Sequence, residues 1–221
     1  MFDRISSSYD RLNRFFSMGI DVVWRSHAVK DLKLTPGMSI LDCSAGTGDM
    51  SLEAHRQCSD IHTILYDPAE SMLQIAGQKA SRRGIRSFEL KCGAAEQIDY
   101  PDCYFDRFMV AFGIRNFQHL EKGLGELHRV LKPGGSGVIL EFTPDRSKII
   151  DFLFKWYMWW VMRPIGGAVS RDKDAYRYLA ETIQKFPSSE KLVDMYRSVG
   201  FSHVEAKRLS LGIATRFLLT K

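Results

Sequence analysis

Short apolar runs alternate with more polar, helix-like segments through the middle of the chain. Helices are predicted over about 50–57, 68–83 and 119–131, and residues 94–106 are predicted to form a loop. Pro68 stands at a usual first helical position, and Lys132–Gly135 is expected to stop the third helix. This alternation predicts a parallel sheet covered by helices on both faces. The predicted strands are MSILDC (38–43), IHTILY (61–66), SFELKC (87–92), RFMVAF (107–112) and SGVILEF (136–142).

The two ends of the chain follow a different pattern. Residues 1–31 are predicted to form two helical pieces split near Met18, and LTPG (34–37) is predicted to be a turn. Helices near 175–184 and 189–198 precede two further runs, 203–209 and 213–220, which are close enough to form an antiparallel hairpin. An α/β fold with a mostly parallel seven-stranded sheet, ending in such a hairpin, is the Rossmann-like layout of class I S-adenosylmethionine-dependent methyltransferases. We expect one domain over 1–221, with an N-terminal helical lid (1–35) and an inserted helical cap over the acceptor site (145–186).

Composition narrows the class of protein without naming a partner. The 221 residues are 45% hydrophobic and 26% charged, which fits a globular domain with a large core. The net charge of +5 is compatible with an anionic membrane surface, with nucleic acid, or with a solvated surface that has no dedicated partner. The four cysteines form no CxxC pair, so no metal is expected, and the polar N-terminus favours a cytoplasmic protein.

The run ILDCSAGTGDM carries the first candidate chemistry. It places Asp42 at a strand end and Gly46 and Gly48 at the turn into a helix, where doubly wound sheets bind nucleotides. Asp67 ends the next strand about 20 residues later, where a carboxylate can bind both ribose hydroxyls. Each of these residues also has a purely structural explanation. The glycines would fit a structural turn, Asp42 could stabilise that turn, and Asp67 could be the N-cap of the following helix. Asp49 in the first helical turn disfavours a pyrophosphate and suits a ligand with a sulfonium and an ammonium group.

Longer motifs point to one family. The chain resembles the ubiquinone/menaquinone biosynthesis C-methyltransferases from Phe2 to its C-terminus, most specifically in FGIRN (112–116) and DAYRYLAETIQKFP (174–187). The resemblance implies an enzyme that uses S-adenosylmethionine, releases S-adenosylhomocysteine and methylates a ring carbon of a polyprenylated quinol. It places the cofactor on Thr47, Asp67, Ala94, Ala95 and Ala111. The family often has an acid or amide at the position of Ala94 and a serine at that of Ala111, so cofactor binding is expected to be somewhat weaker here.

The same resemblance places Arg115, Asn116 and Tyr9 beside the acceptor ring. A quinol carbon becomes nucleophilic when a neighbouring hydroxyl loses its proton, so the site must take that proton or stabilise the phenolate. Arginine stays protonated, and we therefore expect Arg115 to polarise a water or hold the phenolate, with Asn116 orienting it and Tyr9 completing the network. The alternative for Arg115 is a strand-end arginine paired with a carboxylate, and Tyr9 could instead simply pack.

Residues 149–169 are unusually aromatic. Trp156, Tyr157, Trp159 and Trp160 lie within five positions, but charged residues and a Pro-Ile-Gly-Gly break argue against a membrane span. The segment suits either transient contact with a membrane surface or a helix packed over the acceptor site. Another small phenolic acceptor is an alternative substrate. A nucleic-acid partner is not expected because the basic residues are scattered, and the sequence leaves homodimerisation open.

Overall fold

The computed structural model describes residues 14, 17, 19–157, 160 and 182–221. Tyr9 and most of the segment predicted to cap the acceptor site lie outside these residues. The described elements, in chain order, are α2 (Ile20–Asp31), β1 (Ser39–Cys43), α3 (Asp49–Gln57), β2 (His62–Asp67), α4 (Glu70–Arg82), β3 (Phe88–Cys92), β4 (Phe105–Ala111), the 3₁₀ turn η1 (Ile114–Asn116), α5 (Leu120–Val130), β5 (Leu131–Phe142), α6 (Lys148–Tyr157), α9 (Ser189–Ser198), β6 (His203–Leu209), the 3₁₀ turn η3 (Ser210–Gly212) and β7 (Ala214–Thr220).

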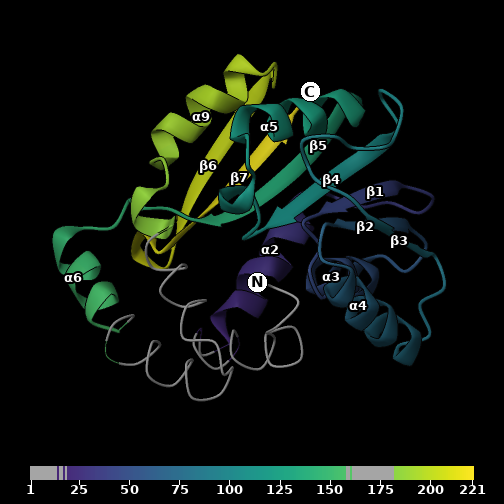
Figure 1. Cartoon of the computed structure of the whole chain (residues 1–221), viewed down its shortest axis with the longest axis horizontal. Coiled ribbons are helices and arrows are strands. Elements are labelled where there is room, and N and C mark those ends of the chain that lie inside the picture. The colour runs from purple at the N-terminus through teal and green to yellow at the C-terminus, as the bar shows by residue number, and fades with distance from the viewer. Residues whose placement is uncertain (1–13, 15–16, 18, 158–159, 161–181) are drawn as a thin grey trace.

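A single sheet dominates the described part of the chain (Figure 1). Its seven strands have the order β3-β2-β1-β4-β5-β7-β6. The first five in this order are parallel, and β7 pairs antiparallel with both β5 and β6. The predicted parallel sheet with a terminal antiparallel hairpin is therefore confirmed.

Alternating strand residues divide the core between the two faces of the sheet. Phe108 and Phe217 pack on one face with α5 and α9. Ile40 and Met109 pack on the other face with α2 and α3, and Leu65 packs there with α4. Figure 1 shows the same division, with α5 and α9 above the sheet and α2, α3 and α4 below it. Because helices cover both faces, a ligand reaches this sheet most easily at the ends of its strands.

The helix predicted to start at Pro68 begins two residues later, at Glu70. The backbone N–H of Ala69 donates to Oδ1 of Asp67 over 2.8 Å, which forms a turn before the helix. An aspartate that binds the backbone two residues ahead competes in this way with helix formation.

The segment predicted to stop the third helix belongs to β5, which begins directly after α5 ends. The N–H of Gly134 donates to the carbonyl of Lys221, and the N–H of Lys221 donates to the carbonyl of Gly135, both over 3.1 Å. The ammonium of Lys221 also donates to the carbonyl of His128 in the last turn of α5. The turn sequence thus ends α5 as predicted. Pairing with Lys221 at the end of the chain then makes this turn sequence part of β5.

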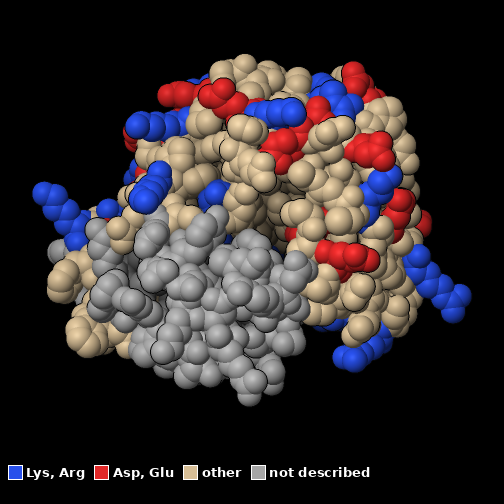
Figure 2. All heavy atoms as spheres, in the orientation of Figure 1, with Lys and Arg blue, Asp and Glu red and all other residues tan. Residues whose placement is uncertain are grey.

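Charges on the molecular surface are mixed. In the face shown in Figure 2, the described Lys and Arg side chains alternate with Asp and Glu and do not gather into one basic patch. This face gives no support for a nucleic-acid interface, which would show clustered basic residues.

Candidate active site

The strand order predicts a ligand-binding crevice at the carboxyl ends of β1 and β4. The chain leaves β1 toward β2 and β3 and later returns to β4 on the other side, which makes this pair the topological switch point of the sheet. Two residues that are not glycine adopt left-handed backbone conformations there: Ser44 (φ 55°) after β1 and Phe112 (φ 59°) after β4. Such strain concentrates at functional sites.

The loops after β1 and β4 also contact each other closely. A Cβ added to Gly113 would lie 2.5 Å from the Cβ of Ser44. The absence of a side chain at Gly113 therefore allows the two strained loops to meet, and they form one rigid edge of the crevice.

Gly46 and Gly48 both adopt left-handed conformations, but for different reasons. A Cβ added to Gly48 would lie 2.9 Å from the Cβ of Ala76, so this glycine lets the loop pack against α4. A Cβ added to Gly46 would have no neighbour within 4 Å among the described atoms, so this residue borders open space. Gly48 therefore serves packing, and Gly46 is the place where a ligand can approach the backbone.

Asp67 ties two segments of this crevice together. Its side chain is buried, and its Oδ2 accepts a hydrogen bond from the N–H of Gly46 over 2.8 Å while Oδ1 accepts from Ala69. The helix N-cap considered as an alternative for Asp67 is not observed, because the N-cap residue of α4 is Ala69; Asp67 instead forms the turn before that helix. A carboxylate accepts up to about four hydrogen bonds, so these two are compatible with its also binding ligand hydroxyls.

Asp42 is fully buried beneath the glycine loop. Its Oδ2 accepts hydrogen bonds from the backbone N–H of Ser51 (3.1 Å) and from its hydroxyl (2.7 Å), at the start of α3. Burial raises the pKa of Asp42 to about 7. Asp42 thus holds the first turn of α3 from inside the fold, whereas its role toward the cofactor stays a prediction.

Lys79 is a member of the site that the sequence did not indicate. Its ammonium donates to the hydroxyl of Thr47 over 3.2 Å and forms an ion pair with Asp49. Burial opposes ionisation of Asp49, but the charges of Lys79 and Arg25 keep its pKa below the usual value. Because a cation of the protein already neutralises Asp49, the argument that this acid favours a positively charged cofactor is weakened.

The three alanines predicted to contact the cofactor have different surroundings. Ala94 is exposed, in the loop that follows β3. Ala95 is buried in the core on the α5 side, and Ala111, at the end of β4, is half-buried against two core clusters. Among the three, only Ala94 presents its side chain to solvent, so any contact made by Ala95 would come from its backbone.

Arg115 lies in η1, close to the crevice, and is almost completely buried. Its guanidinium forms an ion pair with Glu141 of β5, which is fully buried. The carboxylate of Glu141 also accepts from the N–H of Phe142 over 2.9 Å, and burial raises its pKa. The carboxylate partner considered as an alternative for Arg115 therefore exists. The sequence signal for it was Glu141 itself, the one acid in the apolar run 136–142.

The pairing of Arg115 leaves part of its guanidinium available. Its Nε is buried and has no hydrogen-bond partner among the described residues. A buried donor without a partner is unfavourable by about 1–3 kcal/mol, which favours a site where substrate or water completes the bond. Asn116 follows in the same turn, and its N–H donates to the carbonyl of Gly113 over 3.0 Å. Tyr9 lies outside the described residues, so its position beside them stays a prediction.

A model of the ubiE/COQ5 methyltransferase family matches residues 1–221. The chain belongs to this family. It is 39% identical to a demethylmenaquinone methyltransferase of Bacteroides fragilis, over all of this chain and 91% of that protein. It is 40% identical to the ubiquinone/menaquinone biosynthesis C-methyltransferase UbiE of Geotalea daltonii, over 97% and 92%. It is 33% identical to a mitochondrial 2-methoxy-6-polyprenyl-1,4-benzoquinol methylase of Drosophila melanogaster, over 97% and 76%.

Solved structures of more distant proteins support the fold. A SAM-dependent methyltransferase from Aquifex aeolicus superposes with a TM-score of 0.62 at 17% identity, covering 89% of this chain and 88% of that one. The [4+2]-cyclase SpnF superposes with a TM-score of 0.66 at 18% identity, over 90% and 79%. One fold therefore hosts different reactions, and it is the ubiE/COQ5 membership that indicates a methyltransferase and implies S-adenosylmethionine as its cofactor.

Two features are absent from the described residues. Among them, no helix combines the length and apolar character needed to cross a bilayer. No group of three or more His, Cys, Asp or Glu side chains in these residues is arranged to hold a metal ion.

Proposed function

We propose that this enzyme transfers a methyl group from S-adenosylmethionine to a ring carbon of a polyprenylated quinol. The observation that carries the proposal is the family match over the whole chain, with relatives named for demethylmenaquinone and for polyprenyl benzoquinol. The crevice beside Gly46, with Asp67 and Arg115 near its rim, supplies a fitting scaffold.

The residues around the glycine loop fit the cofactor. Gly46 borders open space, Asp67 is held by backbone donors at the end of β2, and Ala94 is exposed beside them. In this proposal Asp67 binds the ribose hydroxyls, Gly46 and Thr47 lie along the methionyl part, and Ala94, Ala95 and Ala111 form the adenine surroundings. The bound cofactor supplies a methyl group on a sulfonium, which is already a good leaving group.

The chain must then activate and align the acceptor. Arg115 is fixed by Glu141 and has an unpartnered Nε, so it is suited to stabilise the phenolate that forms when the quinol loses its proton. Asn116 and Tyr9 complete the acceptor surroundings in this proposal. The hydroxyl proton passes to water, and after methyl transfer the proton of the substituted ring carbon passes through water to the ring oxygen, which restores the aromatic quinol.

The proposal also includes a location and two helical segments near the acceptor. We assign the enzyme to the cytoplasm and to the inner face of the membrane, where its lipid substrate resides, with residues 1–35 as a lid and 145–186 as a cap. The aromatic side chains of Phe152, Trp156 and Trp160 are more than half exposed, which supports transient contact with a membrane surface.

Quinone analysis tests the reaction. In cells that lack this protein, mass spectrometry is expected to show one quinone species that lacks a single methyl group, and the wild-type chain but not Arg115→Ala should restore it. Unchanged quinones would contradict the proposal. A methyl transferred instead to a soluble phenol, with quinones intact, would support the alternative acceptor.

Calorimetric titration tests the cofactor site. Asp67→Ala is expected to weaken the binding of S-adenosylhomocysteine by roughly 1.5–3 kcal/mol, because charge-assisted hydrogen bonds to the ribose are lost. Asp106→Ala serves as a control, since its carboxylate binds Ser39 and Lys132 at the other end of the sheet. Equal affinities for both variants and the wild type, with all three folded, would remove Asp67 from the site.

A further inference from the structure

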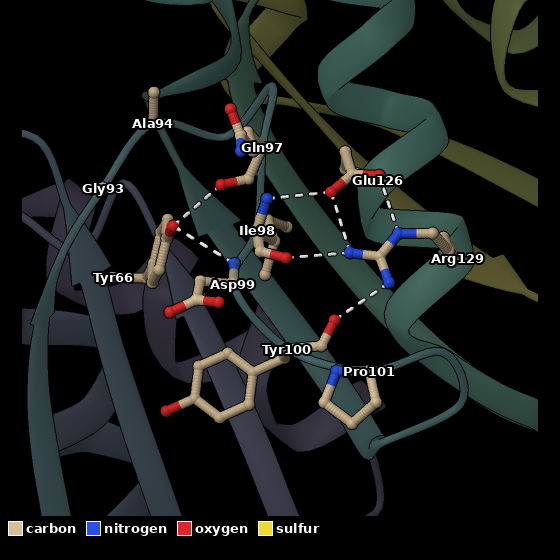
Figure 3. Close-up of a pocket in the computed structure, with 10 residues that line it drawn as sticks. All are labelled: Tyr66, Gly93, Ala94, Gln97, Ile98, Asp99, Tyr100, Pro101, Glu126 and Arg129. Carbon is tan, nitrogen blue, oxygen red and sulfur yellow. Dashed lines mark hydrogen bonds and ion pairs between the residues drawn. The ribbon is translucent and has the colours of Figure 1, made fainter.

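The loop between β3 and β4 is bound at three points by residues of β2 and α5. A cavity of about 530 Å³ lies between this loop, Tyr66 and α5. Figure 3 shows Glu126 and Arg129 of α5 pointing toward the loop backbone. The same loop carries Ala94, which also lines this cavity, and Ala95, and these two residues are the proposed adenine contacts. Contacts that fix the loop backbone therefore also fix the position of these two residues.

The first two points belong to β2. The N–H of Gly93 donates to the carbonyl of Asp67 over 3.2 Å, and the phenol of Tyr66 donates to the carbonyl of Gln97 over 2.9 Å. A Cβ added to Gly93 would lie 2.1 Å from the Tyr66 hydroxyl, so the loop backbone rests directly on that side chain. Tyr66 therefore supports the loop beside the residue proposed to bind the ribose.

The third point belongs to α5. The carboxylate of Glu126 accepts from the N–H of Ile98 over 2.8 Å, and Arg129 donates to the carbonyls of Ile98 (2.8 Å) and Tyr100 (2.9 Å). Glu126 and Arg129 also form an ion pair with each other. Glu126 and Arg129 are therefore bound to the loop backbone and support it from the side of α5.

We infer that Tyr66, Glu126 and Arg129 are positioning residues that hold the loop in its cofactor-binding conformation, an inference that rests on the proposed function. Ala94 has no polar side-chain atom, so the loop recognises adenine through the placement of its backbone. A loop that is ordered before binding loses less conformational entropy when the ligand arrives. The support therefore acts on cofactor affinity and leaves the chemistry at Arg115 unchanged.

A matched pair of tyrosine variants tests this inference. Tyr66→Phe removes the hydroxyl that donates to the carbonyl of Gln97 and accepts from the N–H of Asp99 over 3.4 Å, whereas Tyr100→Phe removes a hydroxyl of the same loop that donates to the Glu89 side chain. Because the contact with Asp99 is long, we expect Tyr66→Phe to raise both the Kd for S-adenosylhomocysteine and the KM for S-adenosylmethionine about 5-fold, the usual effect of losing a hydrogen bond. Its kcat at saturating cofactor and its KM for the quinol should stay unchanged, and Tyr100→Phe should resemble the wild type.

A second pair repeats the test on α5. Glu126→Gln removes the negative charge that binds both Arg129 and the N–H of Ile98. Asp102→Asn removes the charge of another, exposed partner of Arg129, one that does not contact the N–H of Ile98. We expect about a 10-fold loss of cofactor affinity for Glu126→Gln and about none for Asp102→Asn.

The outcomes separate the inference from the proposed function. If the wild type does not bind S-adenosylhomocysteine, the proposed function is wrong. If the wild type binds it and the members of each pair bind alike, the proposed function stands and the inference is overturned. A loss of kcat equal to the loss of affinity in Tyr66→Phe would also overturn it, because a general structural defect would then explain the variant.

Discussion

At the scale of single residues, Arg115 shows how one side chain can satisfy two hypotheses. It has the carboxylate partner expected of a structural arginine, yet the same pairing fixes a buried guanidinium whose Nε has no partner in the described part of the chain. A lysine at this position would keep the charge but lose the planar fork that binds Glu141 and a second group together.

Arg115→Lys is therefore expected to lower kcat by about 10²-fold, as for removal of an oxyanion donor, while S-adenosylhomocysteine affinity stays close to that of the wild type. Arg107→Lys is a matched control: Arg107 is a partly buried arginine at the opposite end of β4 that donates to the carbonyl of Leu32. Single-turnover rates and melting temperatures should be measured on the same preparations. Normal turnover per folded Arg115→Lys molecule would return Arg115 to a structural role.

Asp42 gives a second prediction at this scale, about pH and stability. Its pKa is about 7 in the folded chain and 3.8 as the unperturbed value, so the folded state holds a proton that the unfolded state releases. Between these two pH values the folded state binds more protons, and stability must fall as pH rises. The full shift corresponds to roughly 4 kcal/mol at most, at about 1.4 kcal/mol per unit.

The isosteric variant Asp42→Asn removes this titration. We expect the free energy of unfolding of the wild type to decline relative to the variant as pH increases from about 4 to 7. Urea denaturation of both proteins across this range measures the difference. A difference that stays constant with pH would show that Asp42 is ionised in the folded protein.

At the scale of elements, the glycine loop depends on its packing against α4. Gly48 faces Ala76 and Leu65, whereas Gly46 faces open space, although both have left-handed backbones. An alanine at either position meets the conformational penalty of about 1–2 kcal/mol, but at Gly48 it also collides with α4. Gly48→Ala should therefore lower the free energy of unfolding by about 1–3 kcal/mol more than Gly46→Ala does. Equal losses in chemical denaturation would contradict this placement of the loop.

The elements themselves were largely predictable because their signals are local. The periodic apolar runs gave all the strands of the described sheet, and the hairpin followed from the short spacing of the last two runs. Of the two deviations described above, the first is local: the side chain of Asp67 binds the N–H of Ala69 and delays α4. The second is long-range, because Lys221 draws the residues after α5 into β5, and patterns in a local window do not register such a contact.

At the scale of the whole molecule, the sequence predicted the residues of the candidate site better than the residues that hold them in place. Asp42, Gly46 and Asp67 could be proposed because they lie at or just after the ends of β1 and β2, at the edge where parallel sheets bind ligands. Arg115, in η1, was indicated by the family resemblance. Lys79, Glu141 and the pair Glu126–Arg129 were not predicted, because each acts through a partner that is distant in sequence. Such partners become visible only once the fold brings them together.

The last prediction concerns contact of the whole molecule with a membrane. Phe152 and Trp156 lie four residues apart on α6, which places them on one face, and with Trp160 they are 69%, 53% and 65% exposed. Tryptophan prefers the headgroup region of a bilayer, so this face is suited to bring the enzyme to a substrate dissolved in lipid. Trp156→Ser is expected to weaken binding to anionic phosphatidylglycerol vesicles about 10-fold, equivalent to about 1.4 kcal/mol.

Leu90→Thr is the control, since Leu90 is a partly exposed apolar residue on β3, at the opposite side of the molecule from α6 (Figure 1). Vesicle sedimentation measures binding, and turnover of a short-chain, water-soluble quinol is measured in parallel. If this face contacts the membrane, Trp156→Ser loses vesicle binding and keeps that turnover, because a soluble substrate needs no bilayer. If Trp156 instead packs over the acceptor, turnover of the soluble quinol falls while vesicle binding stays at the level of the wild type, and the membrane assignment is wrong.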